Sequence, residues 1–132
     1  MKNLFKISVL LFVVVLAFSS CKKDDTQEME YVSYDVDYLL TNKLNTEKRF
    51  NIRYYNPAYA NNTVVQDLVR DTLWIRGIKA KSLDVLFVSG ESLTDTADFL
   101  VSVFVDSKLI VSDSAACSWG CDTIARTKYA LP

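Results

Sequence analysis

The chain has 132 residues, with 15 lysines and arginines against 16 aspartates and glutamates, and half of it is apolar, which is enough for one ordered domain. It contains no histidine, which removes the commonest general base and the commonest zinc and copper ligand. The nearly balanced charge lacks the positive excess of nucleic-acid-binding proteins. We therefore expect no nucleic-acid partner, no cofactor and no enzymatic activity.

Residues 1–20 have the pattern of a secretory signal peptide. Lys2 and Lys6 precede an apolar run at 7–18, and small residues follow that run. A helix of this length would rise about 18 Å, which is too short for the roughly 30 Å hydrocarbon core of a membrane. The pattern predicts a cleaved leader rather than a transmembrane anchor.

The next segment, Leu16-Ala-Phe-Ser-Ser-Cys21, resembles a bacterial lipoprotein signal, although Phe18 stands where leucine is commoner. The resemblance implies that Cys21 becomes the first mature residue and carries acyl chains, of which two or more anchor a protein stably. Residues 21–29 then form a charged tether. Within it, Lys23-Asp24-Asp25 resembles the export signal of Bacteroidetes-type surface lipoproteins, with an ordinary charged linker as the alternative.

Residues 30–132 form the predicted mature domain. Apolar side chains recur there with a period of two, which is typical of strands that bury one face. The clearest run places apolar residues at every second position from Val32 to Leu40. A second strand has Phe50, Ile52 and Tyr54 on one face, and turn residues follow it.

Further strands are expected at 64–65, 71–79, 83–88, 99–105, 109–111 and 123–129. The strand at 83–88 is apolar on both faces, so we expect it at the centre of the core, ending at Ser89-Gly90-Glu91. Asp106-Ser107-Lys108 predicts a hairpin loop of about three to four residues. About seven short strands without an amphipathic helix predict an antiparallel, Ig-like β-sandwich, with a small closed barrel as the alternative.

Three features of the strand pattern resemble the MmpS-type small membrane proteins. They are a first strand rich in tyrosine and valine, a strand near Leu73-Trp74, and the hairpin over residues 103–111. The resemblance covers roughly residues 30–125 and implies a β-sandwich on an N-terminal membrane anchor that assists a lipid transporter. This chain departs from that family in having a lipoprotein signal as its anchor, and Leu73-Trp74 in place of the usual Pro-Trp.

Cys117 and Cys121 are separated by Ser-Trp-Gly, and Gly120 favours the turn that a bridge between them needs. Outside the inner membrane such a pair meets an oxidising compartment, so we expect a disulfide. A copper site normally adds histidine or methionine ligands, and the mature chain has no methionine beyond Met29. We therefore expect no metal.

Three aromatic side chains are candidates for ligand binding. Tyr55 and Tyr59 flank the Pro57 turn and would suit stacking against a sugar ring, although strands also use aromatic residues for packing alone. Trp119 stands at the tip of the 117–121 loop. There it would act as a recognition anchor, or it would cover the disulfide and the end of the sandwich.

Two carboxylates raise the possibility of glycosidase chemistry. Asp35 and Asp37 share one face of a strand, which puts their Cβ atoms about 6.5–7 Å apart. Glycosidases use pairs about 5–9.5 Å apart, so the spacing allows the chemistry. A solvated strand face carries such acids routinely, and we favour that interpretation.

Four segments read aspartate, hydroxyl residue, apolar residue, which is more than composition predicts. Their hydroxyl residues are Thr72, Thr96, Ser114 and Thr123. The triplet resembles the O-glycosylation motif of exported Bacteroidetes proteins, and it is also ordinary turn sequence. Because a glycan requires an exposed residue, we expect Thr96 and Ser114, in predicted loops, to be the favoured sites.

Together these patterns predict an outer-membrane lipoprotein, lipid-anchored and exposed on the cell surface. We expect it to act as a surface binding or envelope-accessory module whose partner is a glycan, a lipid or an envelope protein. The alternative is a periplasm-facing accessory of a membrane transporter, as the MmpS resemblance implies.

Overall fold

The computed structural model describes residues 29–132 apart from 45, 47, 70–71 and 121–122. The signal region 1–20, Cys21 and most of the tether lie outside the described residues. Within the described part, no helix is long and apolar enough to cross a membrane. The strands are β1 (Ser33–Asn42), β2 (Phe50–Tyr55), β3 (Thr63–Val69), β4 (Leu73–Lys81), β5 (Val85–Ser92), β6 (Ala97–Val105), β7 (Lys108–Cys117) and β8 (Ile124–Ala130).

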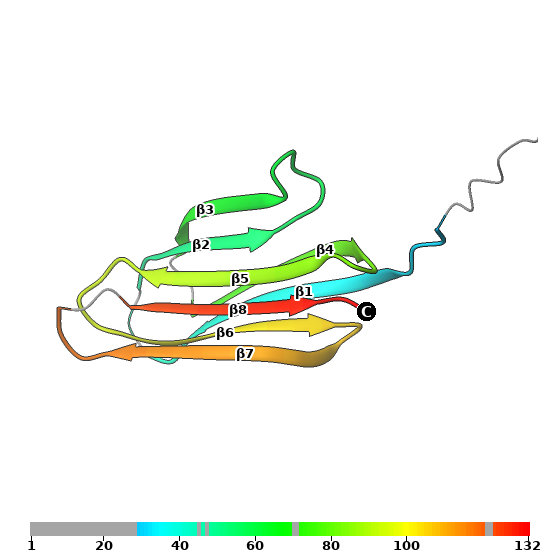
Figure 1. The fold of residues 1–132 in the computed structure, drawn as a ribbon. Helices are drawn as coiled ribbons and strands as arrows, with labels where there is room; N and C mark the ends of the chain where they lie inside the picture. Colours follow the sequence, from blue (N-terminus) through cyan, green and yellow to red (C-terminus); the bar gives the residue numbers. More distant parts are fainter. Residues whose placement is uncertain (1–28, 45, 47, 70–71, 121–122) are drawn as a thin grey trace, which may run out of the picture. The chain divides into compact units, whose positions relative to one another are not determined.

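The strands form two four-stranded antiparallel sheets that pack as a sandwich (Figure 1). One sheet has the order β4-β1-β6-β7 and the other has the order β3-β2-β5-β8. The β2–β3 and β6–β7 hairpins stay within one sheet, whereas the other connections cross between the sheets. The predicted antiparallel β-sandwich is confirmed. It has eight strands, against an expected number of about seven, and the expected strand at 64–65 extends to 7 residues.

Alternation places one face of each sheet in a shared core. In β1 the side chains of Val36, Tyr38 and Leu40 are buried, as the period of two predicts. The rings of Phe50 and Phe99 meet across the two sheets with their centroids 4.9 Å apart. The largest fully buried side chains are Tyr38, Phe50, Phe99, Leu40, Ile52, Leu86, Val36, Val88, Val101 and Val103.

Strand β5 runs through Gly90 to Ser92, so the predicted end of this strand at residues 89–91 is wrong. A Cβ atom at Gly90 would stand 2.8 Å from Leu40 Cδ1 and 3.0 Å from Phe99 Cε2, both on the facing sheet. Glycine is therefore required by close packing between the sheets rather than by a turn.

The β6–β7 hairpin turns on Asp106 and Ser107 alone, which is shorter than the predicted loop. Val105 pairs with Lys108, and the two turn residues have φ values of 48° and 66°. Two consecutive positive φ values define a type I′ turn, whose twist matches that of the flanking strands. Asp106 Oδ1 accepts a 3.0 Å hydrogen bond from the N–H of Asp35, which ties the turn to β1.

The edges of the two sheets meet along β7 and β8. There the Asp113 carboxylate accepts a 2.8 Å hydrogen bond from the backbone N–H of Arg126. A side chain of β7 thus satisfies a donor on the outer edge of β8.

The connections gather at two ends of the sandwich (Figure 1). We call the entry end the one where the chain enters at Tyr31, and it also holds the β2–β3, β4–β5 and β6–β7 connections. The opposite, far end holds the β1–β2, β5–β6 and β7–β8 connections. Because β1 has 10 residues, the two ends lie about 30 Å apart.

Candidate functional site

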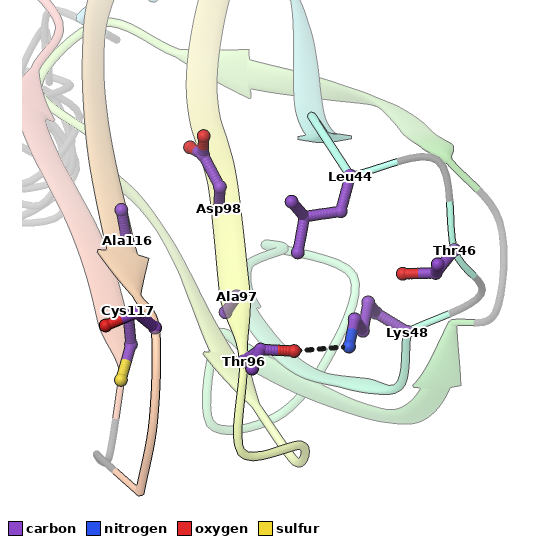
Figure 2. Close-up of a pocket in the computed structure, with 9 residues that line it drawn as sticks. Leu44, Thr46, Lys48, Thr96, Ala97, Asp98, Ala116 and Cys117 are labelled. Carbon is purple, nitrogen blue, oxygen red and sulfur yellow. Dashed lines mark hydrogen bonds between the residues drawn. The ribbon is translucent and has the colours of Figure 1, made fainter.

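A groove opens at the far end of the sandwich, between the β1–β2 connection, the start of β6 and the end of β7 (Figure 2). Its volume is about 710 Å³, within the range of roughly 300–1,000 Å³ that is usual for ligand sites. It is lined by apolar Leu44, Ala97 and Ala116, and by polar Thr46, Lys48, Thr96, Asp98, Cys117 and Ser118.

A small side chain on β7 helps to create the groove. Ala116 pairs with Asp98 and is exposed, so β7 carries an alanine where a larger side chain would fill the space. Ala97, which pairs with Cys117, is buried and forms the floor next to the core. Leu44 extends from the opposite wall toward β6 (Figure 2). The groove therefore combines an apolar surface with a polar rim.

Lys48 provides the positive charge of the groove. Its Nζ donates a 2.7 Å hydrogen bond to Thr96 Oγ1 (Figure 2). The Thr96 carbonyl accepts a 2.9 Å bond from Thr94 Oγ1, which fixes the position of the β5–β6 connection. A lysine ammonium has three N–H donors, so Lys48 keeps donors for a polar ligand.

Buried Asn42, at the end of β1, shapes the wall opposite β6. Its Nδ2 donates a 3.0 Å hydrogen bond to the Thr46 carbonyl, and its Oδ1 accepts a 3.0 Å bond from the N–H of Leu44. An ion pair of 3.4 Å joins Lys43 to the groove residue Asp98. Because both of these charged side chains are solvent-exposed, the pair orients the wall more than it stabilises the fold.

Trp119 follows the groove residue Ser118 and is 86% exposed. A ring exposed to this extent covers little of the sandwich end. The N–H of Gly120 donates a 3.1 Å hydrogen bond to the Asp95 carbonyl, which holds the Trp119 segment against the β5–β6 connection. Cys121, the expected disulfide partner of half-buried Cys117, lies outside the described residues.

The two candidate tyrosines lie at the entry end, away from Trp119. Tyr55 is only 7% exposed, so its place in an exposed aromatic platform is a wrong prediction. Burial, together with a hydrogen bond to Asp84, raises the pKa of Tyr55 to about 12. Tyr59 is 54% exposed in the β2–β3 turn. The structure therefore separates the predicted aromatic candidates instead of gathering them.

The four triplet hydroxyls differ in accessibility. Thr72 is exposed just before β4, and Ser114 is exposed within β7 rather than in the predicted loop. Thr96 is half-buried and bonded to Lys48. Thr123 is 6% exposed, which leaves no room for a glycan on the folded domain. Thr72 and Ser114 therefore meet the exposure requirement best.

The carboxylate pair of β1 is arranged for solvation. Asp35 forms an ion pair with Lys79 on the neighbouring strand β4, and its side chain is 66% exposed. Asp37 is half-buried on the same face of the sheet. In the part of the chain that the structure describes, no cluster of three or more acidic or cysteine side chains is placed to hold a metal ion.

Most groove residues carry no functional signal in the sequence. Thr96 and Cys117 stand out there for other reasons, whereas Leu44 and Lys48 do not. The groove joins segments about 50 and 70 residues apart, and no local pattern indicates that contact.

Comparison with known proteins adds no relative to this geometry. No protein-family model matches the chain, and no curated protein is matched by it.

Proposed function

We propose that this chain is an outer-membrane lipoprotein, anchored through Cys21, whose β-sandwich is a non-enzymatic recognition module. The observation that carries the proposal is the position of the groove and of Trp119 at the far end, opposite Tyr31, where the chain enters the domain. The groove and the point at which the chain enters therefore lie at opposite ends of the domain, so attachment at the entry end leaves the groove open to a ligand.

The reach of such a module follows from chain geometry. A tether of nine residues spans at most about 30 Å when it is extended, and the sandwich adds about the same length. The groove would therefore stand up to about 60 Å from the acyl chains. Together with the export-like Lys23-Asp24-Asp25, this reach supports a domain that faces outward from the cell.

The chemistry of the groove supports a glycan as its ligand. Leu44 and Ala116 offer apolar surface, Lys48 offers N–H donors, and the exposed Trp119 follows the groove residue Ser118 in the chain. A sugar has an apolar face that packs on an aromatic ring and hydroxyl groups that need donors and acceptors. We propose that this end of the sandwich binds both the apolar face and the hydroxyl groups of a sugar.

Binding to a glycan array tests this site, with Trp119→Ala as the variant and Tyr59→Ala as the matched control. Both residues are exposed aromatics, but Tyr59 lies at the other end of the sandwich. We expect Trp119→Ala to weaken binding at least tenfold and Tyr59→Ala to leave it unchanged. Equal losses in both variants, or none in either, would contradict a groove-end site.

Protease treatment of intact cells tests the orientation, with lysed cells as the control. Digestion of the domain in intact cells supports the surface module. Protection until lysis would place the domain in the periplasm and overturn the outward orientation.

A periplasm-facing accessory of a membrane transporter is the second candidate, and one observation favours it. Leu73 and Ile75 are 48% and 55% exposed on the outer face of β4. Ile75 lies beside half-buried Leu39 of β1, with which it pairs. Exposed apolar patches of this kind mark protein contacts. Charged substitutions at Leu73 and Ile75 would abolish co-purification with a membrane protein under this alternative and leave a glycan-binding module active.

Two covalent modifications belong to the same proposal. We propose that Cys117 pairs with Cys121 and so stiffens the loop that presents Trp119, and that Thr72 and Ser114 carry glycans. Alkylation of the native protein before and after reduction tests the bridge, because a closed bridge reacts only after reduction. An intact mass equal to that of the acylated polypeptide would exclude the glycans.

A further inference from the structure

The outer face of the β3-β2-β5-β8 sheet carries two arginines that flank one serine. Arg53 of β2 pairs with Ser89 of β5, and Ser89 pairs with Arg126 of β8. Adjacent strands lie about 4.8 Å apart, so the two arginine Cα atoms are about 10 Å apart with the short serine between them. Both arginines are exposed, and their long side chains can converge above Ser89.

The small serine side chain leaves a hollow at this point. Its volume is about 200 Å³, and its walls are Asn51, Arg53, Ser89, Glu91, Ile124 and Arg126. A second hollow of about 410 Å³ shares Ser89 and Arg126 and extends along the sheet to Phe87 and Lys128. The two hollows adjoin each other, and we refer to them together as the depression over β2, β5 and β8.

The charges in this depression favour an anion. Neither Arg53 nor Arg126 forms an ion pair with any residue that the structure describes. Glu91 is the one acid that lines the depression, and it is engaged at 3.5 Å by the side-chain amide of Asn51. Two guanidinium groups and Lys128 therefore outnumber one carboxylate. A guanidinium group binds a planar carboxylate through two parallel N–H···O bonds.

The other walls suit the ring of a sugar. Asn51 Oδ1 is buried and has no hydrogen-bond partner among the described residues, so a ligand hydroxyl can supply the missing donor. Glu91 offers further acceptor oxygens for hydroxyl groups. Phe87 is half-buried in the adjoining hollow and offers an apolar surface to the carbon-bound hydrogens of a sugar ring.

We propose that Arg53 and Arg126 bind the carboxylate of an acidic sugar, such as a hexuronic acid unit of a polysaccharide. Ser89 provides the space, and Asn51 and Glu91 bind the hydroxyl groups. None of these residues lines the groove at the far end, so this site stands or falls independently of the proposed groove ligand.

Calorimetric titration of the full-length chain with trigalacturonate tests the proposal. We expect Arg53→Ala and Arg126→Ala each to weaken binding at least tenfold, and Arg53→Lys to weaken it by several-fold because lysine lacks the two-pronged donor geometry. Ser89→Leu, which fills the hollow, should abolish binding. Lys108→Ala is the matched control, because Lys108 is exposed on the other sheet and should leave binding unchanged.

Two ligand controls complete the experiment. The neutral analogue trigalactose and inorganic phosphate should each bind at least tenfold more weakly than trigalacturonate. Equal affinity for the neutral analogue would overturn the role of the carboxylate, and equal affinity for phosphate would overturn the sugar. Unchanged binding in both arginine-to-alanine variants, with their thermal unfolding also unchanged, would overturn the site.

Discussion

The buried hydroxyl of Tyr38 leads to a sharp prediction about stability. Tyr38 is fully buried, and its hydroxyl has no hydrogen-bond partner among the described residues. Its ring packs against Tyr54 with the centroids 5.6 Å apart, and Tyr54 in turn packs against Trp74. Burial raises the pKa of Tyr38 above its ordinary value, so the hydroxyl stays protonated and its donor stays unused.

Replacing Tyr38 with phenylalanine should stabilise the domain. An unmade hydrogen bond of a buried group costs about 1–3 kcal/mol, whereas the void left by one oxygen atom costs only about 0.3 kcal/mol. We expect a net gain of about 1–2 kcal/mol, which for a domain of about 100 residues raises Tm by roughly 4–16 °C.

Urea unfolding followed by circular dichroism measures this difference. Tyr55→Phe is the matched control, because it removes the same atom from a hydroxyl that does have a partner, the Asp84 carboxylate. That control should lose about 1.5–3 kcal/mol, since the bond has a charged acceptor. If Tyr38→Phe loses as much stability as the control, the Tyr38 hydroxyl has a partner and the reasoning is refuted.

Three further predictions concern the fold. The pKa of Tyr55 is raised to about 12 from 10.0, so the stabilising effect of its protonated hydroxyl is complete below pH 10 and is lost as the pH rises through 12. Urea unfolding between pH 9 and 12 should show a decline in the free energy of unfolding that Tyr55→Phe reduces. The same decline in Tyr55→Phe would count against the raised pKa. Gly90→Ala should cost about 2 kcal/mol through overpacking against the opposite sheet, whereas Gly77→Ala, which meets only the flexible Asp37 side chain at 3.1 Å, should cost less; equal losses in unfolding assays would contradict this. Ser107→Gly should raise stability by about 0.5 kcal/mol in the same assay, because Ser107 holds a φ of 66° that glycine adopts without strain; a loss would contradict the type I′ assignment.

Local alternation predicts the faces of the strands but not their partners. Val36, Tyr38 and Leu40 are buried as their spacing indicates, because a strand between a core and solvent needs a period of two whatever its neighbours are. The expected strand end at Gly90 is wrong because the side chains that require glycine there lie on the opposite sheet. The expected exposure of Tyr55 is wrong because two consecutive residues at the end of β2 are buried, which breaks the alternation.

The candidate sites were harder to predict because they depend on strand order. Arg53, Ser89 and Arg126 become neighbours only when β2, β5 and β8 lie side by side in that order. Nothing in the sequence around any one of them indicates this. The sequence therefore shows the chemistry of each residue, whereas only the fold shows which residues lie together in a site.

The hydrogen bond between Asp113 and Arg126 makes the edges of the sandwich differ in how readily they pair with a strand of another molecule. Edge strands with unpaired N–H groups are templates on which further chains can add and aggregate. On the β7–β8 side, the Asp113 carboxylate occupies one such N–H, that of Arg126. An incoming strand therefore finds one donor fewer on β8, and its carbonyl oxygens are repelled by the negative charge of Asp113. The growth of any aggregate should therefore begin at the edges formed by β3 and β4.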